Sequence, residues 1–151
     1  MSDPTSTRRF KRVVVKLSGE ALQGQAPHGL DAGTLARIAA DLAASAEAGH
    51  EIAVVVGGGN FFRGIKGADT GIERARADSI GMLATVMNGL ALEQAVEGQG
   101  RQARCLSAVS MPSICESFSR RAALHHLAKG RVVIAAGGTG NPFFTTDTGA
   151  V

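Results

Sequence analysis

The sequence lacks several residue types on which whole classes of protein depend. It contains no tryptophan and no tyrosine, so few aromatic side chains are available for stacking on nucleic-acid bases. Its two cysteines, Cys105 and Cys115, lie outside the spacings of zinc and dithiol redox motifs, which favours two reduced thiols. No apolar run approaches the roughly 18 residues that span a bilayer. We therefore expect neither nucleic acid nor a membrane as a partner.

The signature motifs of the common nucleotide-binding folds are also missing. No GxxxxGK[ST] segment occurs, which excludes a P-loop nucleotide hydrolase. The glycine-rich segments miss GxGxxG, and HRD and DFG are absent, so dinucleotide-binding and protein-kinase folds are unsupported. His125 and His126 are adjacent and cannot share one face of a helix. We expect them to be surface or partly buried side chains, and we expect no metal ligands among the residues of this chain.

The chain carries a small excess of positive charge. It has 16 Lys and Arg against 13 Asp and Glu, a formal net charge of +3. The basic residues are mostly scattered, which argues against a nucleic-acid surface and fits the attraction of small anions. The first residues, MSDPTSTRRFKR, contain no apolar stretch typical of a secretory signal. We therefore expect a cytoplasmic protein with a flexible tail at residues 1–9.

Short apolar runs alternate with amphipathic segments along the rest of the chain. Asp31 is a suitable N-cap and Gly49 a suitable end for a helix between them. Buried strands that alternate with helices are typical of βαβ units. They predict an α/β fold, a three-layer αβα sandwich with a mostly parallel central sheet, formed as a single domain by residues 10–151. The expected strands are 12–17, 52–56, 103–106 and 132–136, and further helices are expected at 73–97 and 117–128.

Three glycine-containing turns follow expected strands. They are Ser18-Gly19, Gly57-Gly58-Gly59 and the segment from Gly137 to Gly140. Any one of them is more simply a tight turn than a binding site. Because ligands of open α/β sheets bind at the carboxyl ends of strands, three such turns on one edge favour a phosphate site. Lys16, Arg63 and Asp147, which accompany them, strengthen that interpretation.

Four segments together resemble the bacterial UMP kinases of the amino-acid kinase superfamily. They are KLSGEAL at 16–22, GGGNFFRG at 57–64, ADSIGMLATVMNGLAL at 77–92 and GTGNPFFTTDT at 138–148. The resemblance runs from Phe10 to the last residue, and the last motif distinguishes these enzymes from carbamate and acetylglutamate kinases. It implies the amino-acid kinase fold and transfer of the γ-phosphoryl of ATP to UMP, giving UDP for pyrimidine nucleotide biosynthesis. It also implies Mg²⁺ bound with ATP, a homohexamer, and GTP or UTP as effectors.

The resemblance also assigns roles to individual residues. It implies catalytic roles for Lys16, Arg63 and Asp147. On the ATP side it implies Lys16, Leu17, Ser18, Gly19, Gly59 and Arg63. On the UMP side it implies Gly58, Asp78, Thr139, Gly140, Asn141, Pro142, Phe143, Phe144, Thr145 and Thr146, with Asp78 at the ribose.

The residues by themselves leave simpler alternatives open at several of these positions. Arg63 could be a solvated arginine after a turn. Asp78 could be a solvated aspartate near a helix start, where the helix dipole favours it. Phe143 and Phe144 could wall a pocket, but we expect one of them to pack into the core. The apolar side of the 73–97 helix is the expected contact between subunits.

The family's chain continues beyond the length available here. Its second half supplies further strands and the adenine pocket, so we expect the C-terminal part of the fold to be absent. Thr146 or Asp147 is a plausible N-cap, but four following residues cannot form a stable helix. We expect weak or absent kinase activity from these 151 residues alone. The alternatives are a non-catalytic module for UMP binding and oligomerisation, or a related acid kinase.

Overall fold

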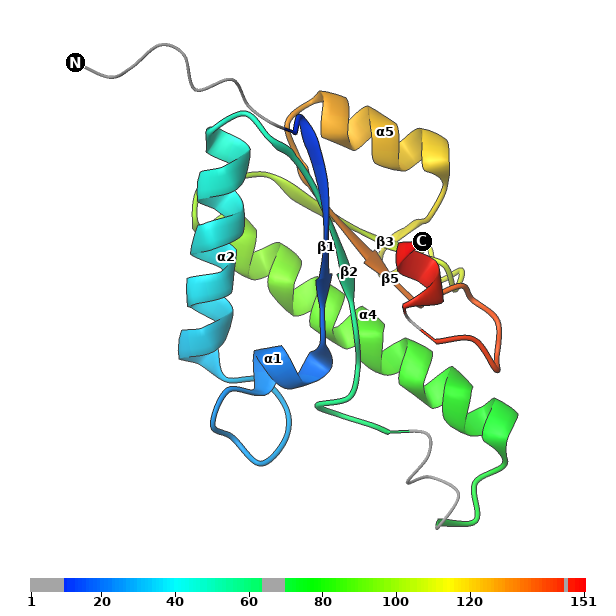
Figure 1. Cartoon of the computed structure of the whole chain (residues 1–151). Helices are drawn as coiled ribbons and strands as arrows, with labels where there is room; N and C mark the ends of the chain where they lie inside the picture. Colours follow the sequence, from blue (N-terminus) through cyan, green and yellow to red (C-terminus); the bar gives the residue numbers. More distant parts are fainter. Residues whose placement is uncertain (1–9, 64–69, 146) are drawn as a thin grey trace, which may run out of the picture.

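The computed structural model describes residues 10–63, 70–145 and 147–151, so the expected tail at 1–9 lies outside it. Within these ranges five strands form one sheet in the order β1-β2-β5-β3-β4, and each neighbouring pair is parallel. The strand arrows therefore point the same way in Figure 1. In chain order the elements are β1 (Arg12–Leu17), α1 (Gly19–Gln23), α2 (Ala32–Glu47), β2 (Glu51–Val56), α4 (Arg74–Gly98), β3 (Ala103–Ser107), β4 (Glu116–Ser117), α5 (Arg120–Ala128), β5 (Val132–Ala136) and the 3-10 helix η2 (Thr148–Ala150).

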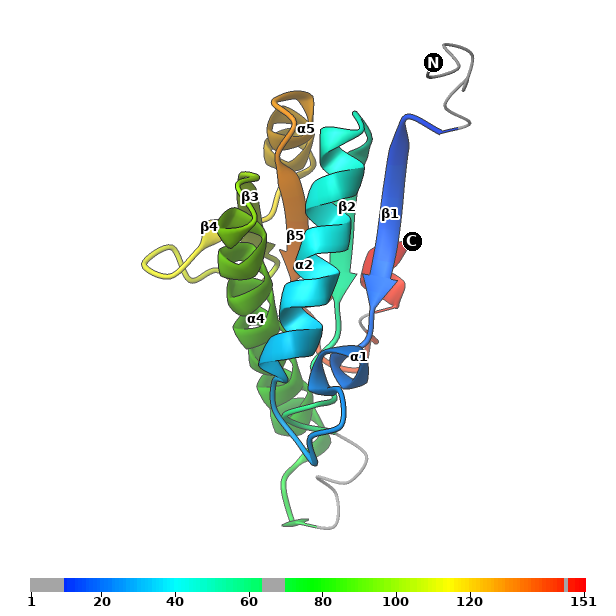
Figure 2. The same cartoon turned by 90° about the vertical axis from the view of Figure 1, so that its left-hand side faces the viewer.

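Helices cover the sheet on both faces, which confirms the predicted three-layer α/β fold. α2 and α4 lie on one face and α5 on the other (Figures 1 and 2). The alternation along β5 shows why: Val132 and Ile134 are buried in the cluster that includes Leu42 of α2 and Leu92 of α4. Val133, which points the other way, packs with Leu127 of α5. No helix in the described part of the chain is long and apolar enough to cross a membrane.

The predicted elements are present, with differences at short segments. The helix expected at 117–128 begins at Arg120, because Ser119 caps it by accepting a hydrogen bond from Ala122 N at 3.0 Å. Glu116 and Ser117, which precede the cap, pair with β3 as the short strand β4. α1, which the sequence analysis does not predict, is a single capped turn: Ser18 Oγ accepts from Ala21 N at 3.2 Å.

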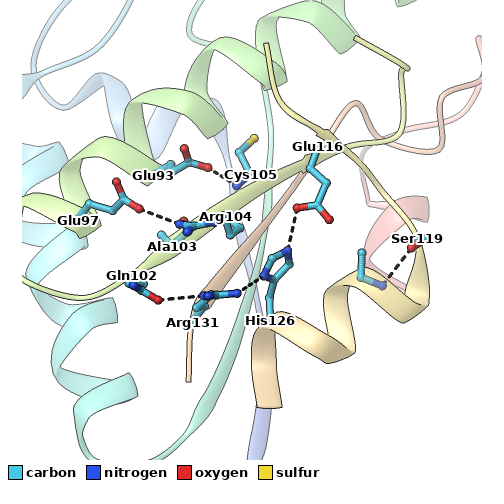
Figure 3. A network of polar contacts seen from close by, with 11 residues as sticks. Glu93, Glu97, Gln102, Ala103, Arg104, Cys105, Glu116, Ser119, His126 and Arg131 are labelled. Carbon is cyan, nitrogen blue, oxygen red and sulfur yellow. Dashed lines mark hydrogen bonds and ion pairs between the residues drawn. The ribbon is translucent and has the colours of Figure 1, made fainter. Parts of the chain in front are cut away.

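His126 connects α5 to the edge of the sheet and is buried, with 6% of its surface exposed. Its Nε2 lies 2.8 Å from a carboxylate oxygen of Glu116 in β4, and its Nδ1 lies 3.0 Å from Arg131 (Figure 3). Since arginine can only donate, Nδ1 accepts and Nε2 carries the proton that is donated to Glu116. Arg131 extends the network to Gln102, at 2.9 Å. His126 therefore holds the two-residue strand β4 against α5.

The two thiols are predicted to react very differently with alkylating reagents. Burial raises the pKa of Cys105 to about 12, and it also raises the pKa of the partly exposed Cys115. At pH 8 iodoacetamide should therefore modify Cys115 slowly and leave Cys105 intact until the protein is unfolded, as read by peptide mass spectrometry. Modification of Cys105 before Cys115 in the folded protein would contradict this burial.

The same pKa shifts affect the stability of the fold. Because folding raises the pKa values of both thiols, the free energy of unfolding should fall as the pH rises above about 8.5, where the thiols of the unfolded chain ionise.

Candidate functional site

The glycine turns after β1 and β2 are in direct contact with each other at the carboxyl ends of the strands. β1 and β2 are neighbours in register from Arg12 opposite Glu51 to Leu17 opposite Val56. A Cβ added to Gly19 would lie only 2.5 Å from the backbone nitrogen of Gly59 and 2.5 Å from Asn60 Oδ1. The third turn, which starts at Gly137, follows β5, the other neighbour of β2. All three predicted turns therefore lie at one edge, as expected.

The end of the chain folds back onto the end of β1. Lys16 Nζ lies 3.0 Å from Asp147 Oδ1, and both side chains remain accessible. Asp147 occupies the N-cap position of the short 3-10 helix η2, but its side chain makes no capping hydrogen bond. The carboxylate pairs with Lys16 instead. Thr146 lies outside the described residues.

Arg63 follows the turn as a half-exposed side chain and forms an ion pair there. Its NH2 group contacts a carboxylate oxygen of Glu20, a residue of α1. The glutamate side chain passes directly over Gly59, where an added Cβ would lie 2.7 Å from Glu20 Oε1. Glu20 and Asp147 thus place a carboxylate beside each of the two predicted catalytic cations. Glu20 is not among the residues predicted from the sequence, although KLSGEAL contains it.

Asp78 joins α4 to the terminal loop. Its side chain is only 17% exposed, accepts a hydrogen bond from Phe143 N at 2.7 Å, and pairs with Arg74 at 3.3 Å. These contacts exclude the solvated alternative. Phe143 has φ of 69°, an uncommon value for a residue other than glycine, and the Arg74 guanidinium lies 5.4 Å from the centre of its ring. Asp78 and Arg74 together hold the loop in this conformation.

The two phenylalanines of the terminal loop lie outside the core. Phe143 is 64% exposed and Phe144 is 59% exposed, so the expectation that one packs into the core is wrong. Both lie on the loop that follows β5 (Figure 1), beside the first turns of α4 and not between a helix and the sheet. Phe144 instead lines a hollow beside Gly58, in agreement with the pocket-wall alternative.

Two hollows open beside the turns and share Gly59 and Phe62. The smaller, of about 150 Å³, is lined by Gly58, Gly59, Phe62, Ala77, Asp78, Gly81, Met82, Thr85 and Phe144. The larger, of about 440 Å³, is lined by Gln23, Pro27, His28, Gly59, Asn60, Phe61, Phe62, Arg63 and Thr70. The residues expected on the UMP side, Gly58 and Asp78, thus line one hollow, and Arg63, expected on the ATP side, lines the other.

Other predicted residues of the terminal loop do not line either hollow. Thr139 and Asn141 bond to each other, since Asn141 Nδ2 donates to Thr139 O at 3.2 Å. Thr145 Oγ1 lies 3.3 Å from the hydroxyl of Thr148. Pro142 is partly buried, and Gly140 approaches Ala108 O. Leu17, at the end of β1, packs against the core.

Three buried polar residues next to the turns were missed by the sequence analysis: Asn60, Thr85 and Asn88. Asn88 Nδ2 donates to Gly57 O at 2.7 Å, and Thr85 Oγ1 accepts from Gly137 N at 2.6 Å. Thr85 and Asn88 are three residues apart on the face of α4 that is otherwise apolar and turned to the sheet. Polar residues at that spacing on a buried helix face were the signal available in the sequence.

Comparison with known proteins identifies the family of the chain. The model of the amino acid kinase family matches residues 11–151. The chain is 58% identical over 142 residues to a uridylate kinase of Azorhizobium caulinodans, which covers 94% of this chain and 60% of that relative. It is 54% identical over 151 residues to a uridylate kinase of Bradyrhizobium diazoefficiens, across 100% of this chain and 62% of the relative.

Solved structures give the same result. A UMP kinase from Bacillus anthracis superposes with a TM-score of 0.89 at 38% identity, over 95% of this chain and 59% of the other. A UMP kinase from Ureaplasma parvum gives 0.86 at 32% identity, over 94% and 62%. The chain spans about 60% of the length of the curated relatives it matches. The match of the family model to nearly the whole chain establishes that the protein belongs to the amino acid kinase family.

Proposed function

We propose that the protein acts as a UMP kinase, which transfers the γ-phosphoryl group of Mg-ATP to UMP and gives UDP for pyrimidine nucleotide biosynthesis. The observation that carries this proposal is the pair of hollows that both include Gly59 in their lining. Asp78 and Phe144 line the one that would receive UMP, and Arg63 lines the one facing the donor. The uridylate kinases that the chain resembles support the same assignment.

The charges at the edge of the sheet suit phosphoryl transfer. This reaction needs positioning and neutralisation of charge more than covalent chemistry. Lys16 and Arg63 would neutralise the phosphates, and Arg63 can grip one in a bidentate manner. Asp147, 3.0 Å from Lys16, would orient the lysine. It need not act as a base, because the phosphate of UMP is already ionised at neutral pH. Backbone N–H groups of Ser18, Gly19, Gly58 and Gly59 would contact phosphate oxygens.

On the acceptor side, Asp78 would hold the ribose of UMP. Its Oδ2 accepts from Phe143 N, so the same carboxylate that binds the sugar also positions the terminal loop. Residues Thr139 to Thr145 would then close over the nucleotide, with hydroxyl and amide groups available to the base and the phosphate. This closure requires the hydrogen bonds within the loop to be exchanged for contacts with UMP.

The carboxylates near the turns are compatible with a Mg²⁺ ion that arrives with ATP. Glu20 and Asp147 are the carboxylates beside the turns, and each is already paired with a cation. Among the described residues no group of three or more Asp, Glu, His or Cys could hold a metal ion, so the ion would be held mainly by the phosphates of ATP, as is common for Mg²⁺ in nucleotide sites. Bound there, the ion would neutralise charge that develops on the transferred phosphoryl group.

A second candidate is a UMP-binding and oligomerisation module without catalysis. It is favoured by the exposed apolar side of α4, where Leu83 is 49% and Met87 is 50% exposed. A homo-oligomer, hexameric as in the resemblance, would bury this surface. Regulation by GTP or UTP and a cytoplasmic location belong to the UMP kinase proposal as well.

Calorimetry and a coupled assay separate the two candidates. The kinase proposal predicts that UMP and Mg-ATP both bind saturably and that ADP forms only when both are present. For the 151 residues alone we expect UMP binding with weak or no ADP formation, because the chain spans about 60% of its relatives. UMP binding without ATP binding, in a protein extended to the relatives' full length, would favour the module. Absence of UMP binding would reject both candidates.

A further inference from the structure

The face of α4 beneath the glycine turns carries polar side chains where an apolar helix face is expected. Asn88 is 0% exposed and Thr85 is 1% exposed. Burial of an amide or a hydroxyl is costly unless it is hydrogen-bonded. Their neighbours on this face, among them Val86, Leu92 and Val96, are apolar core residues. The bonds these two polar groups make therefore explain their presence.

Asn88 forms a reciprocal pair with Asn60. Asn88 Nδ2 donates to Asn60 Oδ1 at 2.7 Å, and Asn60 Nδ2 donates back to Asn88 Oδ1 at 3.0 Å. The second proton of Asn88 Nδ2 goes to Gly57 O, and that of Asn60 goes to Gly29 O. All four N–H bonds are used, so rotating either amide by 180° would lose them. The pair therefore ties both ends of the 57–60 turn to α4 and to the segment before α2.

Thr85 ties the turn after β5 to α4 through hydrogen bonds of its hydroxyl group. Its hydroxyl donates to Met82 O at 2.6 Å and accepts from Gly137 N at 2.6 Å. Gly137 has φ of 81°, a left-handed conformation that favours glycine and starts the third turn. Although Thr85 borders the smaller hollow, both its donor and an acceptor position are occupied by backbone groups. It acts on the site through Gly137.

We propose that Thr85 and Asn88 are positioning residues that set the distance between the anion-binding turns after β2 and β5. One rigid helix holds Gly57 through Asn88 and Gly137 through Thr85, and its first turns carry Asp78. Backbone N–H groups stabilise a phosphate only when they are placed before it arrives, since reorganisation on binding costs affinity. The expected effect on nucleotide affinity rests on the proposed function. The placement of the turns by Thr85 and Asn88 rests only on the hydrogen bonds described above.

The test compares Thr85→Val with Thr85→Ser in the chain without ligand. Valine keeps the shape and removes the hydroxyl, whereas serine keeps the hydroxyl. We expect hydrogen exchange of the Gly137 amide, followed by NMR, to be at least about tenfold faster in Thr85→Val and within about twofold of wild type in Thr85→Ser. If the valine variant does not fold, Thr85→Ala removes the same hydroxyl and is read at the same amide. Equal exchange in the valine or alanine variant and in the serine variant would overturn the inference.

The link to the site is tested by titration with UMP. Thr85→Val and Asn88→Asp should each weaken UMP binding by about 5- to 20-fold, while Thr85→Ser stays near wild type. Asn88→Asp is nearly isosteric but loses the donors to Gly57 O and to Asn60 Oδ1. A purely structural role would lower the melting temperature of both without changing affinity at a temperature where they are folded, and that result would also overturn the inference. Failure of wild type to bind UMP rejects the proposed function instead, and the exchange experiment still decides the placement.

Discussion

Replacing Gly19 with alanine is expected to lower the free energy of unfolding by about 3 kcal/mol, at the upper end of the usual cost of overpacking. The added methyl group would lie 2.5 Å from Gly59 N and from Asn60 Oδ1. One of these obstacles is backbone, which cannot move aside as a flexible side chain can. The turns after β1 and β2 would have to separate, and the Asn60–Asn88 pair would be disturbed. Denaturant unfolding followed by circular dichroism measures the effect.

Gly33→Ala is the matched control. Gly33 lies in the first turn of α2, and an added Cβ would meet its nearest atom at 3.7 Å, an ordinary contact. Alanine is the better helix former, so this variant should be neutral or more stable by up to about 1 kcal/mol. If Gly19→Ala proved as stable as Gly33→Ala, the contact between the first two turns would not exist as described.

Asp78→Asn is expected to weaken UMP binding by about 10- to 100-fold, the usual loss for hydrogen bonds to a charged group. The substitution keeps the size of the side chain but removes its charge and leaves one acceptor oxygen. That oxygen would have to serve both Phe143 N and the ribose, so the terminal loop should loosen as well. Calorimetric titration with UMP gives the affinity, and the Phe143 amide signal in NMR spectra reports on the loop.

Asp41→Asn provides the control for this charge change. Asp41 is an exposed residue of α2 on the sheet face opposite α5, away from the turns. It loses the same charge, so any long-range electrostatic effect on an anionic ligand should be similar. Unchanged UMP affinity in Asp78→Asn, or an equal change in both variants, would show that the ribose assignment is wrong.

The architecture was predictable because its signals are local. Runs such as RVVVKL and VVIAA are apolar and β-branched, and Asp31 and Gly49 bound α2 as expected, within two residues. Once strands and helices alternate, the parallel sheet and the common edge of the turns follow from general rules of topology. α1 and β4 could not be predicted from the sequence, because elements of five and two residues are too short to show a hydrophobic period.

The contacts within the site were not predictable for a different physical reason. Asn60 and Asn88 are 28 residues apart, and Thr85 and Gly137 are 52 apart, so their bonds exist only after the sheet and α4 have packed. The pairing of Arg63 with Glu20 depends likewise on the meeting of α1 and the 57–60 turn. The wrong expectation of a buried phenylalanine arose because an aromatic pair in a loop carries no periodicity. Nothing in the sequence indicated that this loop lies against the first turns of α4 without entering the core.

The most direct test of the account is titration of the wild-type chain with UMP in the absence of ATP, compared with AMP under the same conditions. The smaller hollow, with Gly58, Asp78 and Phe144 in its wall, should bind UMP saturably with one site per chain and should bind AMP at least about tenfold more weakly. Absence of saturable UMP binding, or equal affinity for the two nucleotides, would contradict the assignment of this edge of the sheet as a UMP site.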